Sequence, residues 1–188
     1  MNYFNDERKV KEYIKMCEDT NSKELIDILK NYLEKDSLLL ELGMGPGKDL
    51  NLLKKYYNTI GSDNSQLFLD IYKEKNKDSE LLFLDAVTIN TEKKFDCIYS
   101  NKVLQHLTRE ELSNSILRQK EVLNDEGILF HTFWRGNSEE IYDGLRFVYY
   151  EKEELINIFE KYFNIIEINY YCEEKEKDSI YIILKKKL

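Results

Sequence analysis

An apolar segment that runs straight into a glycine loop constrains this chain more than any other feature of the sequence. Residues 38–42 are leucine except for Glu41, and the next five residues contain three of the seven glycines and the only proline. Leucines at helical spacing follow from Leu50 onward. An apolar run bounded by turn residues is typical of a buried strand, and glycines let the backbone after it approach a ligand. The stretch therefore predicts a strand, a loop and a helix that bind an anionic or nucleoside-bearing ligand.

The spacing of the glycines differs from that of two common classes of nucleotide-binding loop. It is Gly-x-Gly-x-Gly, whereas dinucleotide binders have Gly-x-Gly-x-x-Gly, and the Lys-Ser/Thr pair of a phosphate-binding NTPase loop does not follow. A dehydrogenase is therefore disfavoured. On this stretch alone, an ordinary strand-to-helix turn stays open as the alternative.

Length and charge exclude several classes of protein. The chain has 188 residues, 42% of them hydrophobic, which suits one compact domain over residues 1–188. Its net charge of −8 argues against nucleic acid as the main partner, because neutralising phosphates needs a basic face. No apolar run approaches the ~20 residues of a membrane span, and the polar start is not a signal peptide. We expect a cytoplasmic protein without a membrane partner.

Cysteine and histidine usage argues against disulfides and metals. Cys17, Cys97 and Cys172 are odd in number and far apart, and there are only two histidines. No Cys-x-x-Cys pair is present. We therefore expect three buried, reduced thiols and no metal site.

Strands and helices alternate along the chain. Helices are expected near 5–18, 21–33, 50–57, 65–75, 108–123 and 151–163, and strands over 38–42, 59–62, 81–84, 95–100 and 128–134. A turn at 124–127 and a loop at 136–144 separate later elements, and alternating strands at 166–172 and 180–184 close the chain as an antiparallel hairpin. This order predicts an α/β fold with a doubly wound, mainly parallel seven-stranded sheet and helices on both faces.

Three acids fall where such a sheet binds a ligand, beyond the carboxyl ends of its strands. Asp63 ends the second strand, where a carboxylate can accept both hydroxyls of a ribose, and Asp85 ends the third, where it can accept from an exocyclic amine. Glu41 lies in the first strand, and a carboxylate among leucines needs a partner such as a ligand ammonium. Taken singly, Asp63 and Asp85 could instead cap the helices that follow them.

Four ordered motifs resemble those of the class I S-adenosylmethionine-dependent methyltransferases, in particular the small-molecule type. Residues 39–47 resemble the first motif, 60–65 the second, 84–86 the third and 95–107 the fourth, and 123–129 resemble the turn into the fifth strand. The resemblance covers residues from about 38 to 134, and the terminal hairpin fits the family's last two strands. It departs at Met44, where the family commonly has a small residue or cysteine.

The resemblance implies S-adenosylmethionine as cofactor and S-adenosylhomocysteine as product. The glycine loop would hold the methionine part with Glu41 near its ammonium, Asp63 would take the ribose hydroxyls, and Asp85 with Ala86 would contact the adenine edge. Ser100 would line the cofactor with its backbone. The expected cofactor-binding residues are Glu41, Gly43, Met44, Gly45, Gly47, Asp63, Asn64, Asp85, Ala86 and Ser100.

Methyl transfer from a sulfonium is a direct displacement, in which the protein aligns the nucleophile with the S–CH3 bond. A base is needed only where the acceptor loses a proton, and His106, after the fourth strand, is the candidate catalytic residue. The alternative is that His106 packs against or caps the next helix. His131, inside the fifth strand, is expected to be a satisfied core residue.

We expect the acceptor above the fourth and fifth strands, under N-terminal helices of residues 1–35 that would form a lid. Candidate walls are Tyr3, Tyr13, Gln105, Trp134, Arg135, Arg146, Tyr149 and Tyr150. An acidic acceptor would follow if Arg135 or Arg146 pointed inward. The Asn/Asp-Pro-Pro-Tyr motif of methyltransferases that act on planar amino groups is absent.

The leading hypothesis is methyl transfer to an O, N or other nucleophile of a small-molecule acceptor, by a monomer or a homodimer. The second is a methyltransferase for a protein or RNA group, with recognition supplied by a partner. The third is a non-catalytic S-adenosylmethionine-binding module, although the cofactor motifs look intact.

Overall fold

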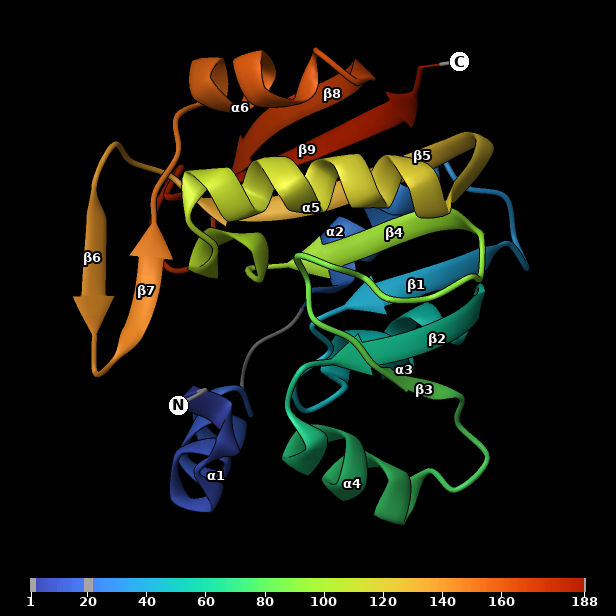
Figure 1. Ribbon diagram of the computed structural model, residues 1–188, viewed down its shortest axis with the longest axis vertical. Coiled ribbons are helices and arrows are strands. Elements are labelled where there is room, and N and C mark those ends of the chain that lie inside the picture. The colour runs from blue at the N-terminus through green and yellow to red at the C-terminus, as the bar shows by residue number, and fades with distance from the viewer. Residues whose placement is uncertain (1–2, 19–21, 188) are drawn as a thin grey trace.

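The structure of the chain is a computed structural model that describes residues 3–18 and 22–187. The main sheet contains β1 Leu38–Leu42, β2 Asn58–Asp63, β3 Leu81–Phe83, β4 Phe95–Asn101, β5 Leu123–Trp134, β8 Phe163–Tyr171 and β9 Ser179–Lys186. These seven strands lie in the order β3-β2-β1-β4-β5-β9-β8 (Figure 1). The first five pair in parallel, and β9 is antiparallel to both β5 and β8. The predicted mainly parallel sheet with a closing antiparallel hairpin is confirmed.

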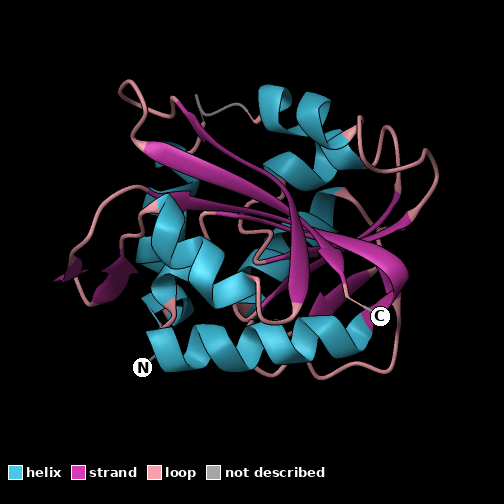
Figure 2. Cartoon of the chain, turned by 90° about the horizontal axis from the view of Figure 1, so that it is seen from above, coloured by secondary structure: helices cyan, strands magenta, loops and turns pink. Residues whose placement is uncertain are grey.

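Helices cover both faces of this sheet (Figure 2). They are α1 Glu7–Met16, α2 Lys23–Leu29, α3 Lys48–Leu53, α4 Gln66–Lys75, α5 Arg109–Val122 and α6 Lys152–Phe159, with short 3-10 helices η1 Tyr3–Asn5 and η2 Leu104–His106. On one face α5 and α6 share an apolar cluster with Leu40, and on the other α2 and α3 share one with Leu39. Burial on both faces explains why β1 is leucine at every position except Glu41 rather than alternating. Within the described residues, no helix has the length and apolar character needed to cross a membrane.

The carboxyl ends of the parallel strands share one edge of the sheet. In Figure 1 this edge faces α1 and a separate two-stranded hairpin, β6 Glu139–Tyr142 and β7 Leu145–Val148. The hairpin corrects the loop predicted at 136–144. Its two-residue turn is Asp143-Gly144, both with positive φ (48° and 85°), which is the geometry that an Asp-Gly pair favours between strands. That dipeptide is the signal that could have revealed the hairpin.

The start of β5 also differs from the prediction. The strand begins at Leu123 rather than Ile128, and its pairing with β4 passes from Phe95↔Leu123 to Cys97↔Ile128. Residues 124–127 therefore form a bulge within the strand, where we predicted a turn before it.

A second bulge changes the exposure of β8. The strand begins at Phe163, and its pairing with β9 skips Ile166, which is 41% exposed. The alternation predicted over residues 166–172 therefore fails at Ile166, because one extra residue shifts the alternation of the strand. The helix predicted to reach Phe163 ends at Phe159, and Phe163 is the first residue of β8.

Helix starts follow the local capping signals. Thr108 and Glu111 form a capping box at α5, with each side chain accepting from the backbone N–H of the other. The start of α1 is set by Asp6, whose carboxylate accepts from Arg8 and Lys9 N. Asn21, predicted to start the second helix, lies outside the described residues.

Cysteine burial is less complete than predicted. Cys97 is buried, whereas Cys17 is partly exposed and Cys172 is exposed. The prediction of three buried thiols is therefore wrong, and it fails at Cys172 because this residue follows the last residue of the edge strand β8.

Candidate functional site

The glycine loop between β1 and α3 has the backbone shape that its sequence predicts. Gly43, Gly45 and Gly47 all have positive φ, at 72°, 48° and 78°. A Cβ built on Gly43 would lie 2.6 Å from both methyl groups of Val103, so a side chain there would displace the segment after β4. Met44 points the other way, into an apolar cluster with Leu50, and offers the site its backbone rather than its thioether.

Asp63 ties the end of β2 to this loop. Its Oδ2 accepts from Gly45 N at 2.9 Å and its Oδ1 accepts from Ser65 N at 2.9 Å. Burial raises the pKa of Asp63 to about 6, although backbone bonds from Gly45, Ser65 and Asn64 lower it. Each carboxylate oxygen can accept more than one hydrogen bond, so both can still bind ligand hydroxyls.

Glu41 is the least satisfied polar group near the loop. Its side chain is buried, and its Oε2 has no hydrogen-bond partner among the described residues. Burial raises the pKa of Glu41 well above its usual range, and the charges of Asp49 and Asp63 raise it further. A buried carboxylate beside two other acids favours a cationic ligand.

Asp49 is a site residue that sequence reasoning missed. Its Oδ2 accepts from the Tyr99 hydroxyl at 2.9 Å and from Asn101 Nδ2 at 3.1 Å. Asp49 lies in the first turn of α3, directly behind the glycine loop. An acid at that position was a readable signal, but its link to the end of β4 is a tertiary contact.

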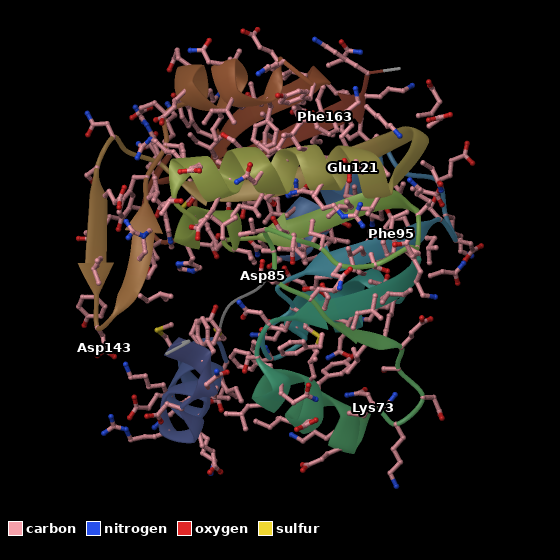
Figure 3. The ribbon with its side chains drawn as sticks, in the orientation of Figure 1. Lys73, Asp85, Phe95, Glu121, Asp143 and Phe163 are labelled. Atoms are coloured by element: carbon pink, nitrogen blue, oxygen red, sulfur yellow. The ribbon has the colours of Figure 1, made fainter. Side chains whose placement is uncertain are left out.

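Asp85 lies at the same edge of the sheet, on the side toward the hairpin whose turn carries Asp143 (Figure 3). Its Oδ1 accepts from Val87 N at 2.8 Å and from Thr88 N at 3.1 Å, and these bonds shape a turn. The alternative that Asp85 caps a helix is wrong, because β4 is the next element after this turn. The carboxylate is exposed, so it can contact a ligand while it shapes its own loop.

Two other predicted cofactor residues use their polar atoms inside the protein. The carbonyl of Ala86 accepts from Ser115 Oγ at 2.6 Å, and Ser100 Oγ lies 2.8 Å from His131 Nδ1. Only the backbone of Ser100 can therefore line a ligand, as the resemblance implies. His131 is fully buried and bonded at both ring nitrogens, which confirms it as a satisfied core residue.

His106 is packed against the hairpin, and it also keeps one ring nitrogen that could act as a base. Its Nδ1 lies 2.6 Å from the Arg146 carbonyl, and its ring packs edge-on against Phe147 at 4.8 Å. Because a carbonyl only accepts, Nδ1 carries the proton and Nε2 keeps a lone pair. Burial lowers the pKa of His106 although the Arg146 bond raises it, so the ring is neutral near pH 7. A packed, oriented and unprotonated imidazole can act as a base.

Both candidate arginines of the acceptor wall are paired with acids. Arg135 is exposed and lies 3.1 Å from Glu151, and Arg146 pairs with Glu139. The inward orientation that would favour an acidic acceptor is therefore not observed. Tyr149 donates to Glu140 on the hairpin at 2.6 Å.

The remaining wall residues divide between the core and the glycine loop. Tyr150 belongs to the apolar core, and Gln105 is buried with its Oε1 accepting from Trp134 N at 3.1 Å. Trp134 is partly buried beneath the Lys102 ammonium, 3.6 Å from the ring centre. Tyr13 lies against the glycine loop, 3.6 Å from a Cβ built on Gly45. The side chain of Tyr3 is outside the described residues.

The N-terminal segment is docked on the loop region. Phe4, Tyr13 and Phe68 form an aromatic trio with ring centres 5.2 to 5.8 Å apart. Ser65 Oγ donates to Phe4 O at 2.6 Å, and Lys48 Nζ donates to Glu18 O at 2.7 Å. These contacts join α1 to both sides of the glycine loop. Over residues 3–18 and 22–187, no group of three or more His, Cys, Asp or Glu side chains could hold a metal ion.

Comparison with known proteins shows what the middle of the chain resembles. Residues 39–127, which include the glycine loop, Asp63, Asp85 and His106, match the family described as "Methyltransferase domain". The matched segment is therefore similar to methyltransferase domains. No curated protein sequence matches the chain.

Solved structures of methyltransferases share the fold of this chain. An S-adenosylmethionine-dependent methyltransferase from Clostridium acetobutylicum matches with a TM-score of 0.76 at 16% identity, covering 94% of this chain and 98% of that chain. A 1,6-didemethyltoxoflavin-N1-methyltransferase from Burkholderia thailandensis, with bound 1,6-didemethyltoxoflavin and S-adenosylhomocysteine, gives 0.79 at 13% identity over 95% and 84% of the two chains. The N-methyltransferase NodS from Bradyrhizobium japonicum, in complex with S-adenosylhomocysteine, gives 0.71 at 16% identity over 91% and 90%. The resemblance to class I methyltransferases and their Rossmann-like fold is confirmed.

The matched segment ends at residue 127. Trp134 to Tyr150, which contain the hairpin and both wall arginines, follow the last matched residue. The residues expected to bind the cofactor therefore lie inside the matched segment, whereas both wall arginines lie outside it.

Proposed function

We propose that this chain transfers a methyl group from S-adenosylmethionine to a nucleophile of a small-molecule acceptor. The observation that carries the proposal is Glu41, a buried carboxylate with an unpartnered oxygen beneath a loop of three glycines with positive φ. S-adenosylmethionine carries a positively charged ammonium and a sulfonium. These charges would stabilise the ionised carboxylates of Glu41, Asp49 and Asp63.

The other cofactor contacts follow from the positions of the strand ends. Asp63 would accept from the ribose hydroxyls with the lone pairs that Gly45 and Ser65 leave unused. Asp85 and Ala86 would face the adenine edge. Tyr13, which lies against Gly45, would cover the cofactor, so residues 1–35 would form the lid over the site.

The chemistry needs little besides alignment. The sulfonium supplies the reactive methyl group, and holding a nucleophile within ~3–3.5 Å of it is the main contribution of the protein. His106 would take a proton from acceptors that must lose one, through the Nε2 lone pair that its bond to Arg146 leaves available.

A small molecule is the acceptor class that the chain supports best. The structural relatives include a methyltransferase crystallised with 1,6-didemethyltoxoflavin and a glycopeptide N-methyltransferase. The acidic net charge of −8 disfavours an RNA acceptor. A protein group remains the second candidate, and a non-catalytic binding module the third.

Calorimetry tests the cofactor assignment. We expect binding of both S-adenosylmethionine and S-adenosylhomocysteine, weakened about tenfold or more by Asp63→Ala, because the ribose loses its acceptor. Asp70→Ala, an exposed acid on α4, is the matched control and should bind as the wild type does. Equal binding by Asp63→Ala would refute the assignment.

A screen of metabolite pools with labelled methyl donor tests turnover. Transfer of label to a small molecule supports the leading proposal, and transfer only to macromolecules supports the second candidate. Cofactor binding without any transfer, in extracts of many sources, would favour the non-catalytic module.

A further inference from the structure

A line of buried polar side chains crosses the apolar layer between the sheet and α5, which lies over β4 and β5 in Figure 1. Ser100 Oγ lies 2.8 Å from His131 Nδ1, and His131 Nε2 lies 2.8 Å from Gln119 Oε1. Gln119 Nε2 then donates to Ser115 Oγ at 3.0 Å, and Ser115 Oγ donates to the carbonyl of Ala86 at 2.6 Å. All four side chains are 0% exposed.

The hydrogen bonds of this line can run in only one direction. The Ala86 carbonyl only accepts, so the Ser115 hydroxyl donates to it and accepts from the Gln119 amide. The Gln119 oxygen then accepts from His131 Nε2–H, and the neutral ring accepts from Ser100 at Nδ1. Burial lowers the pKa of His131 to about 3, which keeps the ring neutral as this order requires. Each polar side-chain atom of the line therefore has a hydrogen-bond partner within it.

The two ends of the line lie on two strand ends that border the site. Ser100 precedes the last residue of β4 and pairs directly with His131 in β5. Ala86 lies in the loop after β3, next to Asp85. The line therefore joins the end of β4 to the β3 loop through the interior of the protein.

A second side chain of α5 holds the same loop further along. Arg118 donates to Ile89 O at 3.2 Å through Nε and to Thr91 O at 2.7 Å through Nη2. Ile89 is buried with a positive φ of 38°, a conformation that a branched residue rarely adopts. The loop is thus built against α5, and the Ser115 bond is the one nearest to the ligand side.

We propose that Ser115, Gln119 and His131 are positioning residues that hold the Asp85-Ala86 backbone at the distance from β4 at which it distinguishes adenine from other purines. The inference rests on the proposed function, which places the adenine edge at Asp85 and Ala86. None of the three side chains touches the ligand. Their role is to fix the loop before the ligand arrives, so that the amine of the base meets its acceptor without a loop rearrangement.

Hydrogen exchange of the ligand-free protein tests the tether by itself. In Ser115→Ala, amides of residues 85–89 should exchange about tenfold faster, whereas the glycine loop should be unchanged. Ser113→Ala is the matched control, because this serine on the same helix is exposed and bonds only within the helix, to Arg109 O. Gln119→Met keeps a side chain of similar volume but removes the hydrogen bond from Gln119 to Ser115. It should also speed the exchange of the amides of residues 85–89.

The preference of the protein for adenine over hypoxanthine tests how the position of the loop affects ligand binding. S-adenosylhomocysteine and S-inosylhomocysteine differ only at one edge of the base, where adenine has an amino group and an unprotonated N1 and hypoxanthine has an oxo group and N1–H. Wild type and Ser113→Ala should prefer the adenosyl ligand by about tenfold or more, and Ser115→Ala should reduce this ratio to about threefold or less. A uniform loss of affinity for both ligands, or an unchanged ratio, would overturn the proposal.

The two experiments separate this inference from the proposed function. A wild-type protein that binds neither ligand would refute the proposed function, and the exchange of residues 85–89 would still decide whether Ser115 tethers the loop. Unchanged exchange in both Ser115→Ala and Gln119→Met would overturn the tether even if the protein binds S-adenosylhomocysteine well.

Discussion

The carboxylate of Asp63 accepts from the backbone N–H of Gly45 at 2.9 Å, and this bond joins the end of β2 to the middle of the glycine loop. It makes the loop conformation depend on an acid whose pKa is raised by burial to about 6. The stability that Asp63 contributes therefore depends on the pH.

The contribution of Asp63 to the stability of the ligand-free protein should fall as the pH rises from about 4 to about 6. In this window folded Asp63, with its pKa of about 6, keeps a proton that the unfolded chain, with a pKa near 3.8, has already lost. Because the folded state binds more protons, the free energy of unfolding decreases with rising pH. Glu41, whose pKa is also raised, contributes with the same sign.

Thermal unfolding between pH 4 and pH 7 measures this effect in wild type and Asp63→Asn. The asparagine variant should show a smaller fall of the melting temperature across the window. An identical pH dependence in both proteins would contradict the raised pKa of Asp63.

Glu41→Gln should stabilise the ligand-free protein and weaken cofactor binding. The raised pKa of Glu41 means that folding at neutral pH must either take up a proton or bury a charge, and a neutral amide avoids this cost of about 1–2 kcal/mol of unfolding free energy. It also removes the acid proposed to face the ligand ammonium, so the dissociation constant of S-adenosylmethionine should rise about tenfold. Denaturant unfolding and calorimetry measure the two effects. Glu153→Gln, an exposed acid on α6, is the control; a loss of both stability and affinity in Glu41→Gln would show a structural role instead.

His106→Ala should lower kcat about 100-fold for an acceptor that must lose a proton, with S-adenosylmethionine affinity unchanged. The wild-type rate should stay level near neutral pH and decline only below the usual range of a histidine pKa, because burial lowers the pKa of His106. Phe147→Leu removes the ring contact of His106 but keeps its Nε2, so it should retain most of the rate. Equal rates in His106→Ala and Phe147→Leu would assign His106 to packing.

Tyr13→Ala should speed the release of S-adenosylhomocysteine about threefold to tenfold, because the tyrosine ring covers Gly45. Tyr13→Phe keeps the ring and its packing against Phe4 and Phe68, and it should release the product at the wild-type rate. Stopped-flow displacement of bound product measures the rate. An unchanged rate of product release in Tyr13→Ala would show that the N-terminal helices do not act as a lid.

Much of the cofactor side was predictable because its signals are local. The leucine run of β1, the three glycines and the acid at the end of β2 are adjacent in sequence to the turns they make, and glycine alone tolerates the positive φ at Gly43 with Val103 beside it. The Thr108 capping box is likewise complete within four residues. Such features need no information from distant parts of the chain.

The acceptor side and the interior were decided by tertiary structure. The pairing of Arg135 with Glu151 and of Arg146 with Glu139, the bulge at Ile166 and the line from Ser100 to Ala86 each join segments that no local pattern links. Sequence by itself determined which residues could bind a nucleoside at the strand ends. Only the packed sheet decided which of them keep polar atoms available for it, because burial and long-range hydrogen bonds set how each polar atom is satisfied.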